Sequence, residues 1–256
     1  MTYLEKLARA ESLLCLGLDP DPARMGAGET PESFLNCLLE GLEEAGALPS
    51  TLKPNLAYFE QYGSRGLRML ERLLERWRSK ALIILDAKRG DIGPSSAAYA
   101  RALFDVWGAD AVTVSPWMGR DSLEPFLERC PEKGVYVLLR TSNPGAADLQ
   151  LAHGAWRRLA TLLTGAWYRP GLGAVMGATG PEELAEFVDG APNFPLLIPG
   201  VGTQGGDAAL VLRALGDGAP IHRVNVSSGI LYAPEGPLEA TRRYAASLAP
   251  HSGQKR

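Results

Sequence analysis

Short apolar stretches recur along this chain at fairly even intervals and alternate with longer stretches of helical character. The short stretches are almost continuously apolar and often β-branched, which is typical of strands that are buried on both faces of a parallel sheet. They predict eight strands, near Leu13–Leu18, Thr51–Pro54, Leu82–Lys88, Ala111–Ser115, Val135–Arg140, Leu172–Gly177, Leu196–Val201 and Arg223–Ser227. The longer stretches predict helices over Glu32–Ala45, Gly66–Trp77, Ser95–Trp107, Asp121–Arg129, Ala155–Thr164, Pro181–Val188, Gly206–Leu215 and Pro237–Leu248.

The start of a helix is marked at Thr30, where a capping residue precedes proline at the first helical position. Strands that alternate with helices favour a parallel sheet covered by helices, and eight repeats in 256 residues favour an α/β fold of the closed (β/α)8 type, a TIM barrel, over an open sheet. No linker or low-complexity stretch divides the chain. We therefore expect one domain over residues 1–256, with a frayed tail after about residue 249.

Composition limits the kinds of partner. The net charge of −3 gives no basic surface for nucleic acid or for an anionic membrane, and no apolar run reaches the roughly 20 residues that span a bilayer. The cysteines (Cys15, Cys37 and Cys130) are few, odd in number and widely spaced, which predicts neither a disulfide framework nor a zinc site. Because Met1–Glu11 also lacks the apolar core of a signal peptide, we expect a cytoplasmic protein.

Charged residues cluster where the third predicted strand ends. The segment Asp86–Ile92, with the sequence DAKRGDI, directly follows the apolar run Ala81–Leu85. Residues two apart on a strand point to the same face, so Asp86 and Lys88 should project together. Such an array is costly to desolvate unless its members pair, which favours a working site over an exposed ion pair that closes a strand. Polar residues also stand at the other predicted strand ends, at Asp19, Lys53, Ser115, Ser142, Gln204 and Ser227–Ser228.

A glycine-rich segment follows the seventh predicted strand. Gly200–Gly205, with the sequence GVGTQG, formally matches the dinucleotide-binding pattern G-x-G-x-x-G. However, the next strand does not end in the acidic residue that such a fold requires, and the segment falls in the seventh unit instead of the first. In a barrel, the loops after strands seven and eight are the usual phosphate site. We therefore predict that the backbone around Gly202 and Gly205 binds a phosphate.

Taken together, these segments resemble orotidine 5′-phosphate decarboxylases over essentially the whole chain. The segments that carry the resemblance are Leu16–Asp21, Lys53–Glu60, Asp86–Ile92 with the signature D-x-K-x-x-D-I, Thr141–Gly145 and Pro199–Gly206. The forms G-L-D-P and K-P-N suggest the bacterial branch with longer loops. The resemblance implies conversion of orotidine 5′-monophosphate to UMP, the last step of de novo pyrimidine nucleotide synthesis, with no metal or organic cofactor.

The same resemblance implies the roles of the charged residues. Lys88 would stabilise and protonate the carbanion at C6, and Asp86 would lie near the departing carboxylate. Lys53 and Asp91 would complete an alternating network that holds Lys88 charged. The resemblance further implies a homodimer with shared active sites, in which Asp91 of one subunit contacts a substrate ribose hydroxyl in the other. Ile92 and Ser95 would lie beside that contact.

The remaining substrate contacts also follow from the resemblance. Asp19 and Lys53 would hold the ribose, and Gln204 would bridge the phosphate and the pyrimidine. Ser142 would bind the pyrimidine, although a turn residue in Ser-Asn-Pro-Gly is an equally good interpretation.

The eighth strand departs from the family pattern. The family usually places a phosphate-binding arginine where this chain has Ser228, so we expect weaker phosphate binding there. Arg223 should face away from this position. Arg169 or another arginine could compensate, and the sequence does not choose between them.

Two other functions remain open at this point. The first belongs to the sugar-phosphate branch of the same barrel superfamily, whose decarboxylases and synthases use Mg²⁺. The histidines His153, His222 and His251 are too scattered to suggest a metal site. The second is a barrel that binds a phosphosugar without catalysis. Trp117, just beyond the fourth predicted strand, could either line the ring pocket or pack under its loop.

Overall fold

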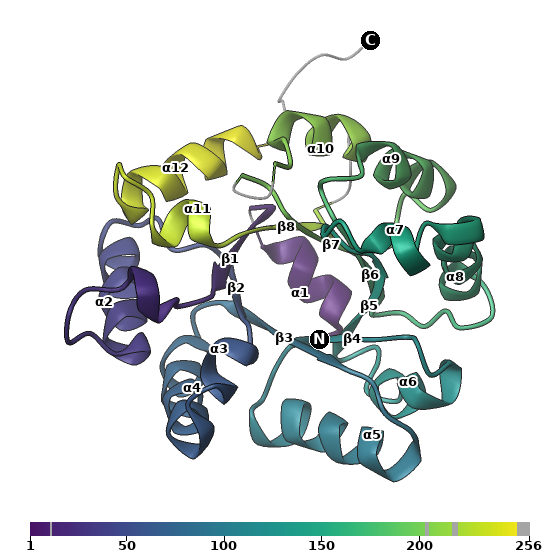
Figure 1. Cartoon of the computed structure of the whole chain (residues 1–256), viewed down its shortest axis with the longest axis horizontal. Coiled ribbons are helices and arrows are strands. Elements are labelled where there is room, and N and C mark those ends of the chain that lie inside the picture. Colours follow the sequence, from purple (N-terminus) through teal and green to yellow (C-terminus); the bar gives the residue numbers. More distant parts are fainter. Residues whose placement is uncertain (11, 203–204, 217–219, 250–256) are drawn as a thin grey trace.

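A closed barrel of eight parallel strands forms the centre of the molecule (Figure 1). The structure, a computed structural model, describes residues 1–10, 12–202, 205–216 and 220–249. Each strand pairs with its neighbours in chain order, and β1 pairs with β8 to close the barrel. The strands are β1 (Leu14–Leu18), β2 (Thr51–Pro54), β3 (Leu82–Arg89), β4 (Ala111–Val114), β5 (Gly134–Arg140), β6 (Leu172–Met176), β7 (Leu196–Pro199) and β8 (Arg223–Val226). The predicted (β/α)8 fold is confirmed, while the frayed tail expected after residue 249 lies outside the described residues.

Helices surround the barrel (Figure 1). The longer ones are α2 (Pro31–Glu44), α4 (Gly63–Trp77), α5 (Gly93–Ala100), α6 (Arg120–Leu127), α8 (Ala155–Thr164), α9 (Pro181–Gly190), α10 (Ala208–Leu215) and α12 (Pro237–Ser247). Three helices of a single turn were not predicted, namely α3 (Ala57–Glu60), α7 (Ala146–Leu149) and α11 (Ser228–Leu231). The stretch Ser95–Trp107, predicted as one helix, is α5 continued by a π-helical segment over Arg101–Val106. Within the described residues, no helix has the length and hydropathy needed to cross a membrane.

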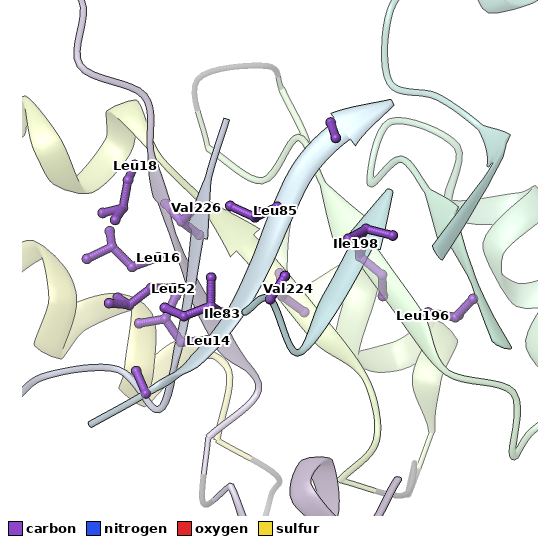
Figure 2. Packing of buried hydrophobic residues seen from close by; sticks show 14 of the residues in the cluster. Leu14, Leu16, Leu18, Leu52, Ile83, Leu85, Leu196, Ile198, Val224 and Val226 are labelled. Carbon is purple, nitrogen blue, oxygen red and sulfur yellow. The ribbon is translucent and has the colours of Figure 1, made fainter. Parts of the chain in front are cut away.

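The alternation of side chains along each strand separates two cores. On β1, Leu14, Leu16 and Leu18 point outward and belong to the large apolar cluster under the helices. Figure 2 shows these leucines together with outward-facing residues of β2, β3, β7 and β8. Cys15 points inward and belongs to a second cluster inside the barrel. Both faces of the strands are therefore buried, which explains why the strands are almost continuously apolar.

One end of the barrel is closed by α1 (Tyr3–Arg9), which lies across the centre of the ring in Figure 1. The Tyr3 hydroxyl donates to the Tyr136 hydroxyl at 3.0 Å inside the barrel. The buried guanidinium of Arg223 donates to the Leu7 carbonyl oxygen at 2.8 Å. These contacts join α1 to the amino-terminal ends of the strands, so the accessible end of the barrel is the carboxyl-terminal one.

Candidate active site

The carboxyl-terminal end of the barrel contains a cavity with a volume of about 550 Å³. Because the carboxyl ends of all eight parallel strands meet at this end, polar side chains far apart in the sequence converge on it. The residues predicted as site residues that line this cavity are Asp19, Lys53, Asp86, Lys88, Ser142 and Ser228. They lie on β2 and β3 and on the segments that follow β1, β5 and β8.

At the base of the cavity, two lysines share one aspartate. The Lys53 ammonium donates to Asp86 Oδ2 at 2.9 Å, and the Lys88 ammonium donates to Asp86 Oδ1 at 2.6 Å. The side chains of Lys53 and Asp86 are 4% and 11% exposed, whereas that of Lys88 is 48% exposed. Lys88 is therefore the member of the cluster that a bound molecule can reach.

The charges of this cluster stabilise one another. Burial alone would lower the pKa of Lys53, but the carboxylates of Asp86 and Asp19 outweigh it and raise that pKa. Burial would likewise raise the pKa of Asp86, but the two lysines hold it well below its usual range. Lys53 and Asp86 are thus both charged at neutral pH, which is the state that an electrostatic site requires.

Thr113 on β4 is a further member of the cluster that the sequence analysis missed. Its hydroxyl donates to Asp86 Oδ1 at 2.8 Å and accepts a hydrogen bond from the Lys88 backbone N–H at 3.0 Å. Thr113 is only 1% exposed, although its side chain is polar. A threonine as the single polar residue in the strand Ala111–Val114 was the available signal, but threonine is also common in buried strands for reasons of packing.

The local backbone of β3 places Lys88 in the cavity. The pairing of β3 with β4 shifts register between Leu85 and Arg89, which is the mark of a bulge. Lys88 has a φ of +48°, a left-handed conformation that is unfavourable for a residue with a side chain. The next residue, Arg89, turns outward and forms an ion pair with Glu60. Backbone strain of this kind persists where the surrounding structure enforces it, and it is concentrated at functional sites.

Several buried oxygens near the cavity have no hydrogen-bond partner among the described residues. They are Asp19 Oδ1, Asn225 Oδ1 and Ser227 Oγ, and all three residues line the cavity. Gly17 on β1 lies close to Ser227, directly after β8. A Cβ added to Gly17 would lie only 2.7 Å from Ser227 Cβ, so this close approach requires glycine. Buried polar atoms are normally hydrogen-bonded, so these acceptors are suited to the hydroxyl groups of a ligand.

The glycine-rich loop after β7 is folded on itself. The Gly202 N–H donates to the Gly206 carbonyl at 3.0 Å, and the Gly205 N–H donates to the Gly202 carbonyl at 2.9 Å. Both glycines have φ values near +86°, which residues with side chains rarely adopt. Gln204, predicted to bridge phosphate and pyrimidine, lies outside the described residues.

Asp91, Ile92 and Ser95 do not line the cavity of their own chain. Asp91 lies beyond the end of β3, and its carboxylate accepts a hydrogen bond from the Ile92 N–H at 2.8 Å. Ile92 is 57% exposed at the start of α5, and Ser95 is exposed on its first turn. All three side chains therefore lie on the surface beside the cavity rather than in it.

The arginines considered as replacements at position 228 lie elsewhere. Arg169 lies before β6, toward the closed end of the barrel, and its guanidinium is 3.6 Å from the Glu124 carboxylate. Arg223 is fully buried at the start of β8, and its guanidinium donates to the Leu7 carbonyl at the closed end of the barrel. Trp117 is 77% exposed and borders a separate apolar hollow with Trp156, so it neither lines the cavity nor packs under its loop.

Metal ligands are not grouped in the part of the chain that the structure describes. No set of three or more histidine, cysteine, aspartate or glutamate side chains is placed there to hold a metal ion. His222 is buried beside the first residue of β8, at the end of the barrel opposite the cavity.

Comparison with known proteins places the chain in a family. Residues 12–244 match the orotidine 5′-phosphate decarboxylase / HUMPS family. The orotidine 5′-phosphate decarboxylase of Verminephrobacter eiseniae is 48% identical over 244 residues, which cover 90% of this chain and 88% of that protein. The structure of Leishmania donovani OMP decarboxylase matches with a TM-score of 0.84 and 34% identity, over 97% of this chain and 98% of that one.

A second solved structure, that of Leishmania donovani UMP synthase, matches with a TM-score of 0.84 and 36% identity. The match covers 96% of this chain but 55% of that one, so this chain corresponds to about half of the larger protein. Nearly the whole sequence and the whole barrel match these proteins. The cluster of Lys53, Asp86 and Lys88 at the cavity base is consistent with this match. This chain therefore belongs to the orotidine 5′-phosphate decarboxylase / HUMPS family.

Proposed function

We propose that this protein decarboxylates orotidine 5′-monophosphate to UMP, the last step of de novo pyrimidine nucleotide synthesis, with Lys88 as the residue that acts on C6. The observation that carries the proposal is the contact of Lys53 and Lys88 with the two oxygens of Asp86 at the base of the cavity. The family and the names of the two decarboxylase relatives support the same reaction.

The reaction needs a positive charge and a proton at one carbon atom. When the bond from C6 to the carboxylate breaks, its electron pair remains on C6 and CO2 leaves. The Lys88 ammonium, which faces the cavity, stabilises that charge as it develops and then gives a proton to C6. Asp86 fixes the position of this ammonium through a contact of 2.6 Å, and its own negative charge would disfavour the substrate carboxylate before CO2 leaves.

The ribose has complementary groups in the same cavity. The unpartnered Asp19 Oδ1 can accept a ribose hydroxyl, and Lys53 lies at the cavity base beside it. Ser142 lines the cavity after β5, where it would bind the pyrimidine ring. These assignments depend on the roles that family resemblance gives to the residues, together with the position of each at the cavity.

The Mg²⁺-dependent sugar-phosphate reaction is not favoured. The Verminephrobacter eiseniae relative, at 48% identity, carries the decarboxylase name. In addition, both oxygens of Asp86 already accept hydrogen bonds, from Lys53 on one side and from Lys88 and Thr113 on the other. A hard cation would have to displace these donors to reach the carboxylate.

Loss of the orotidine ultraviolet absorbance in excess EDTA tests the reaction. Wild-type protein should consume orotidine 5′-monophosphate, and Lys88→Ala should reduce turnover by at least about a thousandfold, since it removes both the charge and the proton donor. Lys80→Ala, which removes a surface lysine paired with Glu43, should retain full activity. Absence of turnover in the wild type, or equal turnover in Lys88→Ala, would refute the proposal.

We further propose that the protein forms a homodimer in the cytoplasm, with Asp91 of each subunit completing the active site of the other. Apolar side chains are exposed on the segments after β3 and β4, including Ile92, Trp117 and Met118, which are 57%, 77% and 51% exposed. A dimer that covers them would remove this surface from water. Cys15, Cys37 and Cys130 are all free, which suits a reducing compartment.

Mixing two inactive variants tests the shared site. Lys88→Ala and Asp91→Ala should each lose activity, and an equal mixture should regain roughly a quarter of full activity after subunit exchange. Half of the dimers would then be mixed, and each would contain one intact site. Failure to regain activity, with subunit exchange verified by sedimentation of labelled protein, would show that Asp91 does not act across the interface.

A further inference from the structure

The cavity contains three cationic residues in the part of the chain that the structure describes, Arg24, Lys53 and Lys88. Lys53 and Lys88 both form ion pairs with Asp86. The Arg24 guanidinium forms no ion pair and no hydrogen bond with any described residue; its contact is with the face of an aromatic ring. Arg24 is therefore the cavity cation that has no carboxylate partner among the described residues.

The position of Arg24 is fixed by the structure around it. Its guanidinium carbon lies 4.1 Å from the centre of the Tyr232 ring, and that ring also stacks on Phe34 at 5.5 Å with an interplanar angle of 9°. The Tyr232 hydroxyl accepts a hydrogen bond from the Asp21 N–H at 2.5 Å. The Asp21 carboxylate in turn accepts from the Ala23 N–H at 3.0 Å, which closes the turn that bears Arg24.

This arrangement brings a loop from the start of the chain to the segment that follows β8. Tyr232 is the residue directly after α11, the helix that begins at Ser228. Ser228 and Arg24 both line the cavity, so a cation from the segment after β1 shares this cavity with the serine. Stacking on an aromatic ring leaves the edge of a guanidinium free for bidentate contact with an oxyanion.

Among the described residues, the other groups that line the cavity include no further cation to neutralise a phosphate. The N–H groups of Gly202 and Gly205 already donate to carbonyls within their own loop. The described carboxylates that line the cavity are those of Asp19, Asp21 and Asp86, and they balance the three cations. A ligand with a dianionic phosphate therefore needs a cation that is not already paired.

We propose that Arg24 binds the phosphate group of the substrate, in the place that an arginine at position 228 would otherwise fill. This inference rests on the proposed function, because it concerns the phosphate of orotidine 5′-monophosphate. It explains how a chain with Ser228 still presents a charged, bidentate group to the anion. It also makes the β1 loop and Tyr232 part of substrate recognition.

The test compares a substrate that has the phosphate with one that lacks it. Arg24→Gln should lower kcat/KM for orotidine 5′-monophosphate by about 10- to 100-fold, the value of a charge-assisted hydrogen-bonded pair. The kcat/KM for orotidine, followed over hours by chromatography of the product, should change by less than about twofold. Arg24→Lys, which keeps the charge but not the bidentate geometry, should fall between the wild type and Arg24→Gln.

A matched control is Arg68→Gln, which removes an exposed arginine on α4 that does not line the cavity. It should leave both substrates unaffected. Equal losses for orotidine 5′-monophosphate and orotidine in Arg24→Gln would overturn the assignment, as would no loss for either. If the wild-type protein does not decarboxylate orotidine 5′-monophosphate at all, the proposed function itself fails. If the wild type is active and Arg24→Gln is equally active, only the role of Arg24 fails.

Discussion

Asp86 is the residue on which the charged cluster depends, because it is the only one that contacts both Lys53 and Lys88 among the ion pairs of the described residues. Charged groups that are mostly buried are costly, and apolar residues of similar size often stabilise a fold as well or better. The stability of the barrel therefore does not explain why these residues are present. Their arrangement makes sense as a preorganised field directed at the cavity.

Thr113 offers a test of that preorganisation. Thr113→Val keeps the shape of the side chain but removes the hydrogen bonds to Asp86 Oδ1 and from the Lys88 N–H. Each such hydrogen bond contributes about 1 kcal/mol, so loss of both should lower kcat by about 30-fold, with KM changed by less than about twofold. Steady-state kinetics measures both values.

Two variants separate positioning from a general loss of structure. Thr113→Ser retains the hydroxyl and should recover most of kcat. Thr241→Val removes a buried hydroxyl that donates to the Pro237 carbonyl at 2.7 Å, away from the cavity, and should leave kcat unchanged. A fall in kcat that Thr113→Ser does not reverse would mean that packing, and not the hydroxyl, is what the cluster requires.

The residues that sequence reasoning found and missed differ in a physical way. Asp86 and Lys88 are two apart at a strand end, so the periodicity of a strand predicts that they project together, and both contact the same cavity. Arg24 belongs to a loop that no periodicity describes, and its platform Tyr232 lies near the other end of the chain. The contact of Arg24 with Tyr232 depends on closure of the barrel. The sequence predicts the closed barrel as a fold but not the individual contacts that its closure creates.

At the level of elements, the strands could be predicted because burial on both faces leaves a strong apolar signal, as in Leu82–Leu85 of β3. The single-turn helices α3, α7 and α11 contain four residues each, too few to show a helical period. The bulge in β3 was also missed, although it determines the left-handed conformation of Lys88. Irregular elements are those that tertiary contacts, not local pattern, specify.

Helix α1 allows a prediction about which end of the barrel supports stability. Leu7 is 0% exposed and packs in the interior cluster with Tyr3 and Tyr136. Leu7→Ala should lower the free energy of unfolding by about 3 kcal/mol, because it leaves a cavity in a packed region. The kcat should not change, since α1 lies at the end opposite the active-site cavity.

Urea denaturation and steady-state kinetics measure these two quantities on the same preparations. Leu149→Ala is a suitable control, because Leu149 is 57% exposed and its truncation should cost little stability. A loss of kcat in Leu7→Ala under conditions where the protein is fully folded would contradict the separation of the two ends.

For the whole molecule, the two ends of the barrel contribute differently to stability. The open end contains charges, unpartnered oxygens and a strained lysine, all of which cost stability. The closed end compensates with α1, with the buried network of Arg223 and with apolar packing. His222 is an exception at that end: its two ring nitrogens are buried and have no hydrogen-bond partner among the described residues. This histidine links the stability of the whole molecule to pH.

Burial, together with the neighbouring Arg223 guanidinium, lowers the pKa of His222 from 6.5 to about 4. The unfolded chain binds a proton at this histidine near pH 6.5, whereas the folded protein does so only near pH 4. Stability should therefore fall as the pH drops from about 6.5 to 4, by up to about 3 kcal/mol in total. The carboxylates held at low pKa values, such as Asp86, lose their contribution only at lower pH, so the upper part of this interval reports His222.

Denaturant unfolding at pH 7.0, 6.0 and 5.0 measures this dependence directly. His222→Leu should largely remove the slope between pH 6.5 and 5, since it removes the group that the unfolded chain protonates preferentially in that interval. His153→Asn, which replaces an exposed histidine, should leave the slope as in the wild type. If His222→Leu retained the wild-type slope, the pH dependence would have to arise from other groups, and His222 would be protonated equally in the folded and unfolded states.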